Sequence, residues 1–190
     1  MPLTSLAAGA AAALLALGGL APAYASQSRG GPLDEMAEVS AQRALIADDV
    51  AAAKFGTDSP IDDPAREQQI LADVRQRSAG LGIDPDVAVQ VFRDHIEASK
   101  DVQRALFAYW TAHPESAPTE RPDLGEIRGK LDAITTQLLD DLRVTEGARR
   151  SPACPGFRIA AEVHVWHKER LDGLHTRALV RSLSSVCESS

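Results

Sequence analysis

The segment from about residue 85 to 112 constrains the fold most, because it carries one long stripe of side chains at helical spacing. The stripe follows a strict 4-3-4-3-4 spacing and reads Phe92, Ile96, Ser99, Gln103, Leu106, Trp110. This spacing places all six side chains on one face of a long α-helix. Alanine and leucine are abundant, β-branched clusters are rare, and no alternating strand pattern of useful length occurs. The sequence therefore predicts an all-α fold, a single helical domain of about six helices.

Start and stop signals place the other helices. Asp63-Pro64 and Asp84-Pro85 each join a capping carboxylate to a proline suited to the first helical position. Asp123 and Glu126 form a capping box. We expect helices over about 33–56, 64–80, 85–112 and 124–146, followed by one or two more over about 153–168 and 169–186.

The N-terminus has the pattern of a secretory signal peptide over residues 1–25. An uncharged apolar run precedes Ala23-Tyr24-Ala25, which is a small-x-small cleavage site. A membrane anchor is the alternative, but about 15 apolar residues are short for a span. We expect cleavage after Ala25, a linker over 26–32, a main helical region over 33–148 that holds the candidate site, and a C-terminal helical extension over 149–190. No second apolar run could cross a membrane, so the mature protein is expected to be exported and free of the membrane.

The chain has only two cysteines, Cys154 and Cys187. Export would place them where disulfides persist, so we expect one bridge that braces the C-terminal helices. Two free thiols are the alternative. Two cysteines do not make a zinc site, and we expect no metal.

Composition also bounds the partners. The net charge is −7, the aromatic content is 4%, and no dense run of lysine and arginine occurs. Nucleic acid is therefore not an expected partner.

Polar side chains interrupt or flank the apolar stripes of four helices. These residues are Arg43 and Lys54 on the first helix, Arg66 and Glu67 on the second, Ser99 and Gln103 on the third, and Arg128 on the fourth. Buried cations need anions, and nearby acids are few. Arginine binds carboxylates through two parallel hydrogen bonds, so a compact dicarboxylate would fit. A capped surface turn remains the alternative for Arg66.

No nucleophile is evident. Ser99 has only His95 one helical turn before it, and that histidine is typical of a satisfied core residue. His164 and His167 are best interpreted as parts of a solvated helix rather than as zinc ligands. Arg149 and Arg150, together with Arg75 and Arg77, are interpreted as solvated positive charges.

These residues carry a family resemblance. The pattern resembles the all-helical chorismate mutases, and most closely their exported class. The matching segments are AQR at 41–43, AAAK at 51–54, PIDDPAREQQIL at 60–71, GIDPD at 82–86, IEASKDVQ at 96–103 and SAPTERPDL at 116–124 followed by Arg128. The paired cysteines of the extension also match that class. The similarity covers roughly residues 33–187.

The resemblance implies a site and a reaction. Arg43, Arg66 and Arg128 would bind the two carboxylates of chorismate. Lys54 and Gln103 would donate to the ether oxygen whose C–O bond breaks. Glu67 would accept from the substrate hydroxyl, and Asp63 and Ser99 would help to position that end. The reaction would be the cofactor-free rearrangement of chorismate to prephenate, in a homodimer whose sites are each built from one chain.

The rival hypothesis is a non-enzymatic exported helical protein that binds a small anion or another protein. It accounts for the helices, the cysteines and the signal peptide. It gives no reason for cations and amide donors to share the stripes of several helices.

Overall fold

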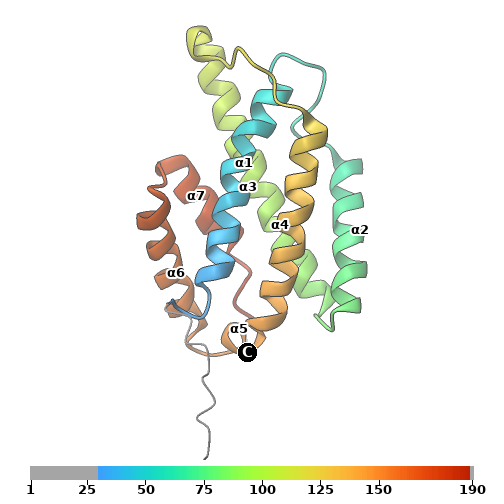
Figure 1. Cartoon of the computed structure of the whole chain (residues 1–190), viewed down its shortest axis with the longest axis vertical. Helices are drawn as coiled ribbons and strands as arrows, with labels where there is room; N and C mark the ends of the chain where they lie inside the picture. The colour runs from blue at the N-terminus through green and yellow to red at the C-terminus, as the bar shows by residue number, and fades with distance from the viewer. Residues whose placement is uncertain (1–29, 189–190) are drawn as a thin grey trace, which may run out of the picture.

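The computed structural model describes residues 30–188, and the predicted signal peptide at 1–25 lies outside these residues. The described chain is helical throughout its regular structure and has no strand (Figure 1). Its elements are α1 (Asp34–Lys54), α2 (Pro64–Gly80), α3 (Pro85–Ala112), the 3-10 turn η1 (Pro114–Ser116), α4 (Leu124–Val144), α5 (Glu146–Arg149), α6 (Cys154–Glu169) and α7 (Gly173–Ser182). The prediction of an all-α fold is confirmed.

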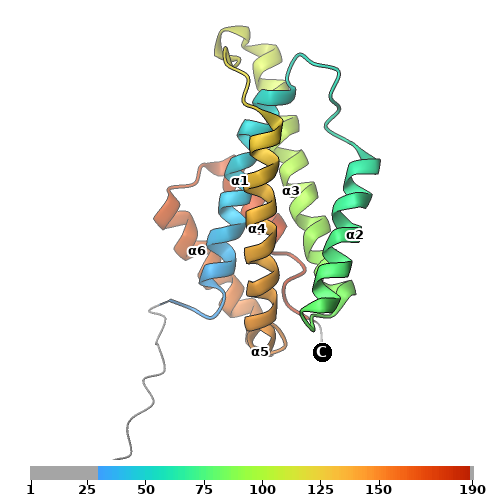
Figure 2. The ribbon, with the colours of Figure 1, turned by 45° about the vertical axis from the view of Figure 1, so that its right-hand side comes forward.

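Helices α1, α3 and α4 form the centre of the bundle. α1 packs against both α3 and α4, while α6 and α7 cover α1 and α7 also packs on α3. α2 packs against α3 and α4 and stands at the opposite edge of the bundle from α6 (Figure 2). The space between α2 and the central helices is thus bounded by α1 to α4 and by the segment before α2.

The predicted capping signals begin the helices. The Asp63 carboxylate accepts from the backbone N–H of Arg66 at 3.0 Å, and the Asp123 carboxylate accepts from that of Glu126 at 2.9 Å. α2 and α3 have the predicted bounds. α1 ends at Lys54, two residues before the expected stop at Gly56, whose φ of 70° favours glycine. The short elements η1 and α5 were not predicted.

One main hydrophobic core joins the two sides of the bundle. Phe92 of α3 is fully buried among residues of α1, α4, α6 and α7, including Met36, Leu138, Val165 and Leu179. Of the stripe predicted for α3, only Phe92 is among the buried residues of this core. This packing fixes the three helices that carry Arg43, Gln103 and Arg128.

The C-terminal segment is fastened to the bundle at two points. Cys154 and Cys187 form a disulfide with a Cα–Cα distance of 5.7 Å, as predicted. The interpretation of Arg149 as a solvated charge is wrong, because its side chain is only 2% exposed. It donates to the Glu188 carboxylate at 2.6 Å and to the Leu142 carbonyl at 3.1 Å. Burial is tolerated because a carboxylate 39 residues away pairs with it.

None of the described helices combines the length and the apolar character that crossing a bilayer requires.

Candidate functional site

A cavity of about 820 Å³ lies between α1, α2, α3, α4 and the segment before α2. All eight predicted ligand-contacting residues line it, although seven come from four different helices and Asp63 comes from the segment before α2. They are Arg43, Lys54, Asp63, Arg66, Glu67, Ser99, Gln103 and Arg128. The cations and amide donors of separate stripes therefore meet in one space.

Arg43 lies at the floor of this cavity. It is 7% exposed, and among the described residues neither its Nε nor its Nη1 has a hydrogen-bond partner. Burial lowers the pKa of Arg43 below its ordinary value, to about 10, and Asp132 partly opposes this effect. A buried guanidinium with unused donors is costly unless an anion pairs with it. The floor of the cavity is thus prepared for an anionic group.

Ser99 and Gln103 satisfy part of each other's hydrogen-bonding capacity. Gln103 Nε2 donates to the Ser99 carbonyl and to its Oγ, both at 3.2 Å. The other amide atom, Oε1, is buried without a partner. An amide nitrogen carries two hydrogens and both acceptors are on Ser99, so Gln103 can donate into the cavity by releasing one of these two contacts.

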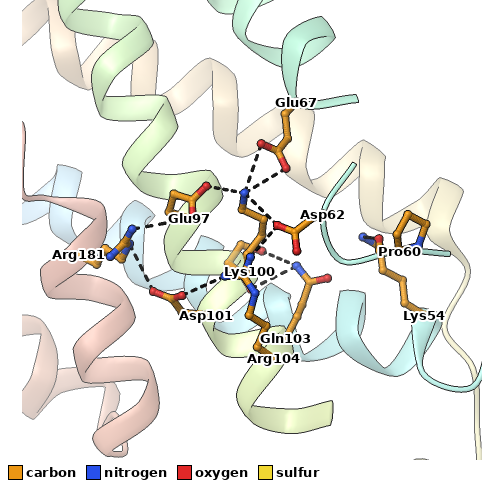
Figure 3. Close-up of polar contacts among 11 residues, drawn as sticks. Lys54, Pro60, Asp62, Glu67, Glu97, Lys100, Asp101, Gln103, Arg104 and Arg181 are labelled. Carbon is orange, nitrogen blue, oxygen red and sulfur yellow. Dashed lines mark hydrogen bonds and ion pairs between the residues drawn. The ribbon is translucent and has the colours of Figure 1, made fainter. Parts of the chain in front are cut away.

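Lys54 closes the upper part of the cavity at the end of α1. Its Nζ donates to the Pro60 carbonyl at 2.9 Å, which leaves further N–H groups for a ligand (Figure 3). Burial lowers the pKa of Lys54 below its usual value, Asp63 opposes this effect and Arg128 adds to it. The backbone of the segment before α2 therefore holds the ammonium beside the cavity.

The rim is formed by α2 and α4. Asp63 both lines the cavity and caps α2, so its carboxylate is already engaged with a backbone N–H. Arg66 is exposed and its Nη1 lies 3.5 Å from Gln69 Oε1. Arg128 is also exposed. The exposed Arg66 and Arg128 can thus contact an anion at the rim of the cavity, and Arg43 can contact it at the buried end.

Lys100 was missed by the sequence analysis. It is 8% exposed, and its Nζ donates to both oxygens of Glu67 at 3.2 and 3.3 Å. The same Nζ pairs with Glu97 and lies 3.4 Å from Asp62 (Figure 3). Although burial acts to lower it, the carboxylates of Glu97 and Glu67 raise the pKa of Lys100 above its usual value.

This ammonium ties α2 and the segment before it to α3. Asp62 also accepts from Arg104 of α3 at 2.6 Å. The available signal for Lys100 was its position, four residues after Ile96 and next to Ser99 on the edge of the stripe.

Arg77 and Thr136 form one wall of the cavity. Arg77 Nη2 donates to Thr136 Oγ1 at 2.7 Å, and its Nη1 reaches Asp73 at 3.4 Å. The interpretation of Arg77 as a merely solvated charge is therefore incomplete, because it joins α2 to α4.

The cavity offers no arrangement for covalent or metal chemistry among the described residues. No group of three potential metal-binding side chains occurs there. His95 packs near Phe92, and burial together with Arg43 lowers its pKa to about 3, so it is neutral at pH 7. What the described residues can do is bind a small anion, orient it and donate hydrogen bonds to it. Fold and site thus define an all-helical protein with a cation-lined cavity for a compact dianion.

Comparisons with known proteins agree with this class. The family model "Chorismate mutase type II" matches residues 34–104. The secreted chorismate mutase of Mycolicibacterium smegmatis is 38% identical over 178 residues, which cover 94% of this chain and 98% of the relative. The secreted chorismate mutase of Mycobacterium tuberculosis is 31% identical, over 90% of this chain and 85% of the relative.

Solved structures give the same result. The crystal structure of chorismate mutase from Burkholderia thailandensis superposes with a TM-score of 0.78 at 35% identity, covering 82% of this chain and 99% of that one. The crystal structure of chorismate mutase from Burkholderia phymatum superposes with a TM-score of 0.79 at 31% identity, covering 83% of this chain and 97% of that one. The chain belongs to the chorismate mutase family.

Proposed function

We propose that the cavity converts chorismate to prephenate by a [3,3] rearrangement, with no covalent intermediate and no cofactor. The observation that carries this proposal is the buried, unpartnered guanidinium of Arg43 in a cavity shared with Lys54, Arg66 and Gln103. The reaction is intramolecular, so it needs a folded substrate and stabilisation of the breaking ether bond. It needs no nucleophile.

The arginines would supply orientation. Arg43 would pair with one carboxylate at the floor, and the exposed Arg66 and Arg128 would bind the other near the rim. Planar guanidinium groups bind carboxylates through paired hydrogen bonds and therefore fix direction as well as position. Holding both ends of the substrate favours the compact chair-like shape over extended ones.

Lys54 and Gln103 would supply the electrostatic part of catalysis. Negative charge grows on the ether oxygen as the C–O bond lengthens, so donors aimed at it bind the transition state more tightly than the ground state. Both side chains are already held by neighbours, through the Pro60 carbonyl and Ser99 respectively. Little reorganisation is then needed when the substrate reacts.

Glu67 would accept a hydrogen bond from the substrate hydroxyl, with Asp63 and Ser99 helping to position that end. Lys100 donates one hydrogen bond to each oxygen of the Glu67 carboxylate and so holds this carboxylate in place. We therefore add Lys100 to the proposed site as a positioning residue.

The required energy is within reach of these groups. A millionfold acceleration corresponds to about 8 kcal/mol. Removing one preorganised donor to a developing oxyanion costs about 2.7–4 kcal/mol in other enzymes. Two such donors and a preorganised substrate conformation can together account for the total.

The test is the loss of chorismate absorbance on adding purified protein, with prephenate identified as the product. Turnover supports the proposal. Saturable chorismate binding without turnover would contradict it and favour the non-enzymatic binding protein.

We also propose that the mature protein is exported and forms a homodimer. Export is supported by the predicted cleavage site after Ala25 and by relatives that are named as secreted. N-terminal sequencing of the mature protein should begin at Ser26. Light scattering on a sizing column should give twice the chain mass, and a monomer would refute the homodimer.

A further inference from the structure

A second cavity, of about 840 Å³, lies behind the wall made by Arg77 and Thr136. Both residues line both cavities. The second cavity is bounded by α1, the end of α2 and α4. Its acidic lining residues are Glu35, Glu38, Asp140 and Asp141.

Asp141 is the unusual member of this lining. It is 8% exposed, and among the described residues no group donates to its buried Oδ2. A carboxylate held out of water without a donor is destabilising. Burial raises the pKa of Asp141 to about 6, and the charges of Glu35 and Asp140 act in the same direction. The Asp141 carboxylate therefore has no cation paired with it among the described residues.

The cations nearby are already engaged elsewhere. Arg143 donates to Asp140 through Nε and Nη2 at 3.1 and 2.6 Å. Lys168 pairs with Glu38 at 2.6 Å, and Arg77 is turned toward Asp73 and Thr136. This leaves the negative charges of Asp141 and Glu35 in excess at the cavity.

The rest of the lining indicates what kind of cation would fit. Val39 is partly buried, and Leu81 is an exposed apolar side chain at the end of α2. Gln42 and Gln137 add amide groups. No three potential metal ligands gather among the described residues, so an apolar body is better matched than a bare metal ion.

We propose that this second cavity binds an organic cation, namely a primary ammonium on an aliphatic stem, whose N–H groups donate to the buried carboxylate of Asp141. The stem would lie along Val39 and Leu81. The proposal does not rest on the chorismate mutase activity, because a ligand can be detected here by binding alone.

The probe is cadaverine, compared with 1,5-pentanediol, which has the same stem without charge. Isothermal titration calorimetry on the purified mature protein should show one saturable site for the diamine and none for the diol. Asp141→Asn keeps the shape but removes the charge, and it should weaken binding at least tenfold, since hydrogen bonds to charged groups contribute about 1.5–3 kcal/mol.

Two further variants locate the site. Gly80 lines the cavity, and a Cβ atom added there would meet no atom within 4 Å. Gly80→Leu can therefore be introduced without a clash at Cβ, and its longer side chain should block the cavity. Lys130→Met removes an exposed charge on α4 outside the cavity and should leave binding unchanged.

Three outcomes would overturn the proposal. The first is the absence of saturable binding up to about 10 mM diamine, since even a 1 mM dissociation constant would then be visible. The second is equal binding of the diol. The third is undiminished binding by Asp141→Asn and Gly80→Leu, both shown to be folded by circular dichroism.

Discussion

Replacing Arg43 with methionine should make the protein more stable and much less active. Among the described residues, the guanidinium is buried without partners for Nε and Nη1. Its pKa in the fold, about 10, lies below the ordinary value of arginine, so the unfolded chain holds this proton more tightly. Below pH 10 the charge therefore destabilises the fold, and the penalty disappears only as the pH rises from there to the ordinary pKa.

The size of both effects follows from the structure. The lowering of the Arg43 pKa from its ordinary value to about 10 corresponds to about 3 kcal/mol, at about 1.4 kcal/mol for each tenfold change in the protonation equilibrium. Packing lost with the longer arginine stem reduces this, so we expect Arg43→Met to gain about 1–3 kcal/mol. Loss of a charge-assisted carboxylate contact of about 1.5–3 kcal/mol should lower kcat/KM by about 10- to 150-fold.

Stability is measured by urea unfolding followed by circular dichroism, and activity by chorismate absorbance. The matched control is Lys130→Met, which removes an exposed charge from α4 and should stay within about 0.5 kcal/mol of the parent. A loss of more than about 1 kcal/mol in Arg43→Met would refute the reasoning, because it would mean that the guanidinium holds the fold together.

Four other outcomes are expected. Lys54→Ala should lower kcat by about 10²–10³, because the proposed donor to the ether oxygen is lost, and it should leave the helical circular dichroism signal unchanged; surviving turnover would remove that residue from the mechanism. The parent should keep its activity between pH 6 and 8, whereas Gln103→Glu should lose about tenfold per pH unit above the pKa of the new carboxyl group, which donates only when protonated. Lys100→Met should raise KM and cost about 1–3 kcal/mol of stability. A double-mutant cycle with Glu67→Gln should show coupling in KM, which a lysine with a purely structural role would not show. Removing the disulfide should cost about 3–4 kcal/mol in urea unfolding, and an unchanged midpoint would contradict the chain-entropy estimate.

Local signals were sufficient to predict the helices. The starts of α2 and α3 are set by Asp63-Pro64 and Asp84-Pro85 through contacts within one helical turn. Such contacts can be inferred from residues that are adjacent in the sequence. The stripe through Phe92 predicted part of the buried face of α3, but Ala98 and Val102, which it did not include, are buried as well. The short α5 has too few residues to show any period.

Long-range charge pairs could not be predicted in the same way. Arg149 looks like a surface residue until Glu188 is brought beside it by the fold. Lys100 depends on Glu67, 33 residues away and on another helix. The candidate cations were found because they lie on or beside apolar stripes, whereas which of them remain unpaired, as Arg43 does, depends on the packing of several helices at once.

The bridge between Cys154 and Cys187 encloses the turn that separates α6 from α7. Exposed turns are preferred points of proteolytic attack, and an exported protein meets proteases. A single cut anywhere between the two cysteines would leave both pieces covalently attached. A nicked chain would therefore run at full mass on a gel until a reducing agent is added, and only then separate into two fragments.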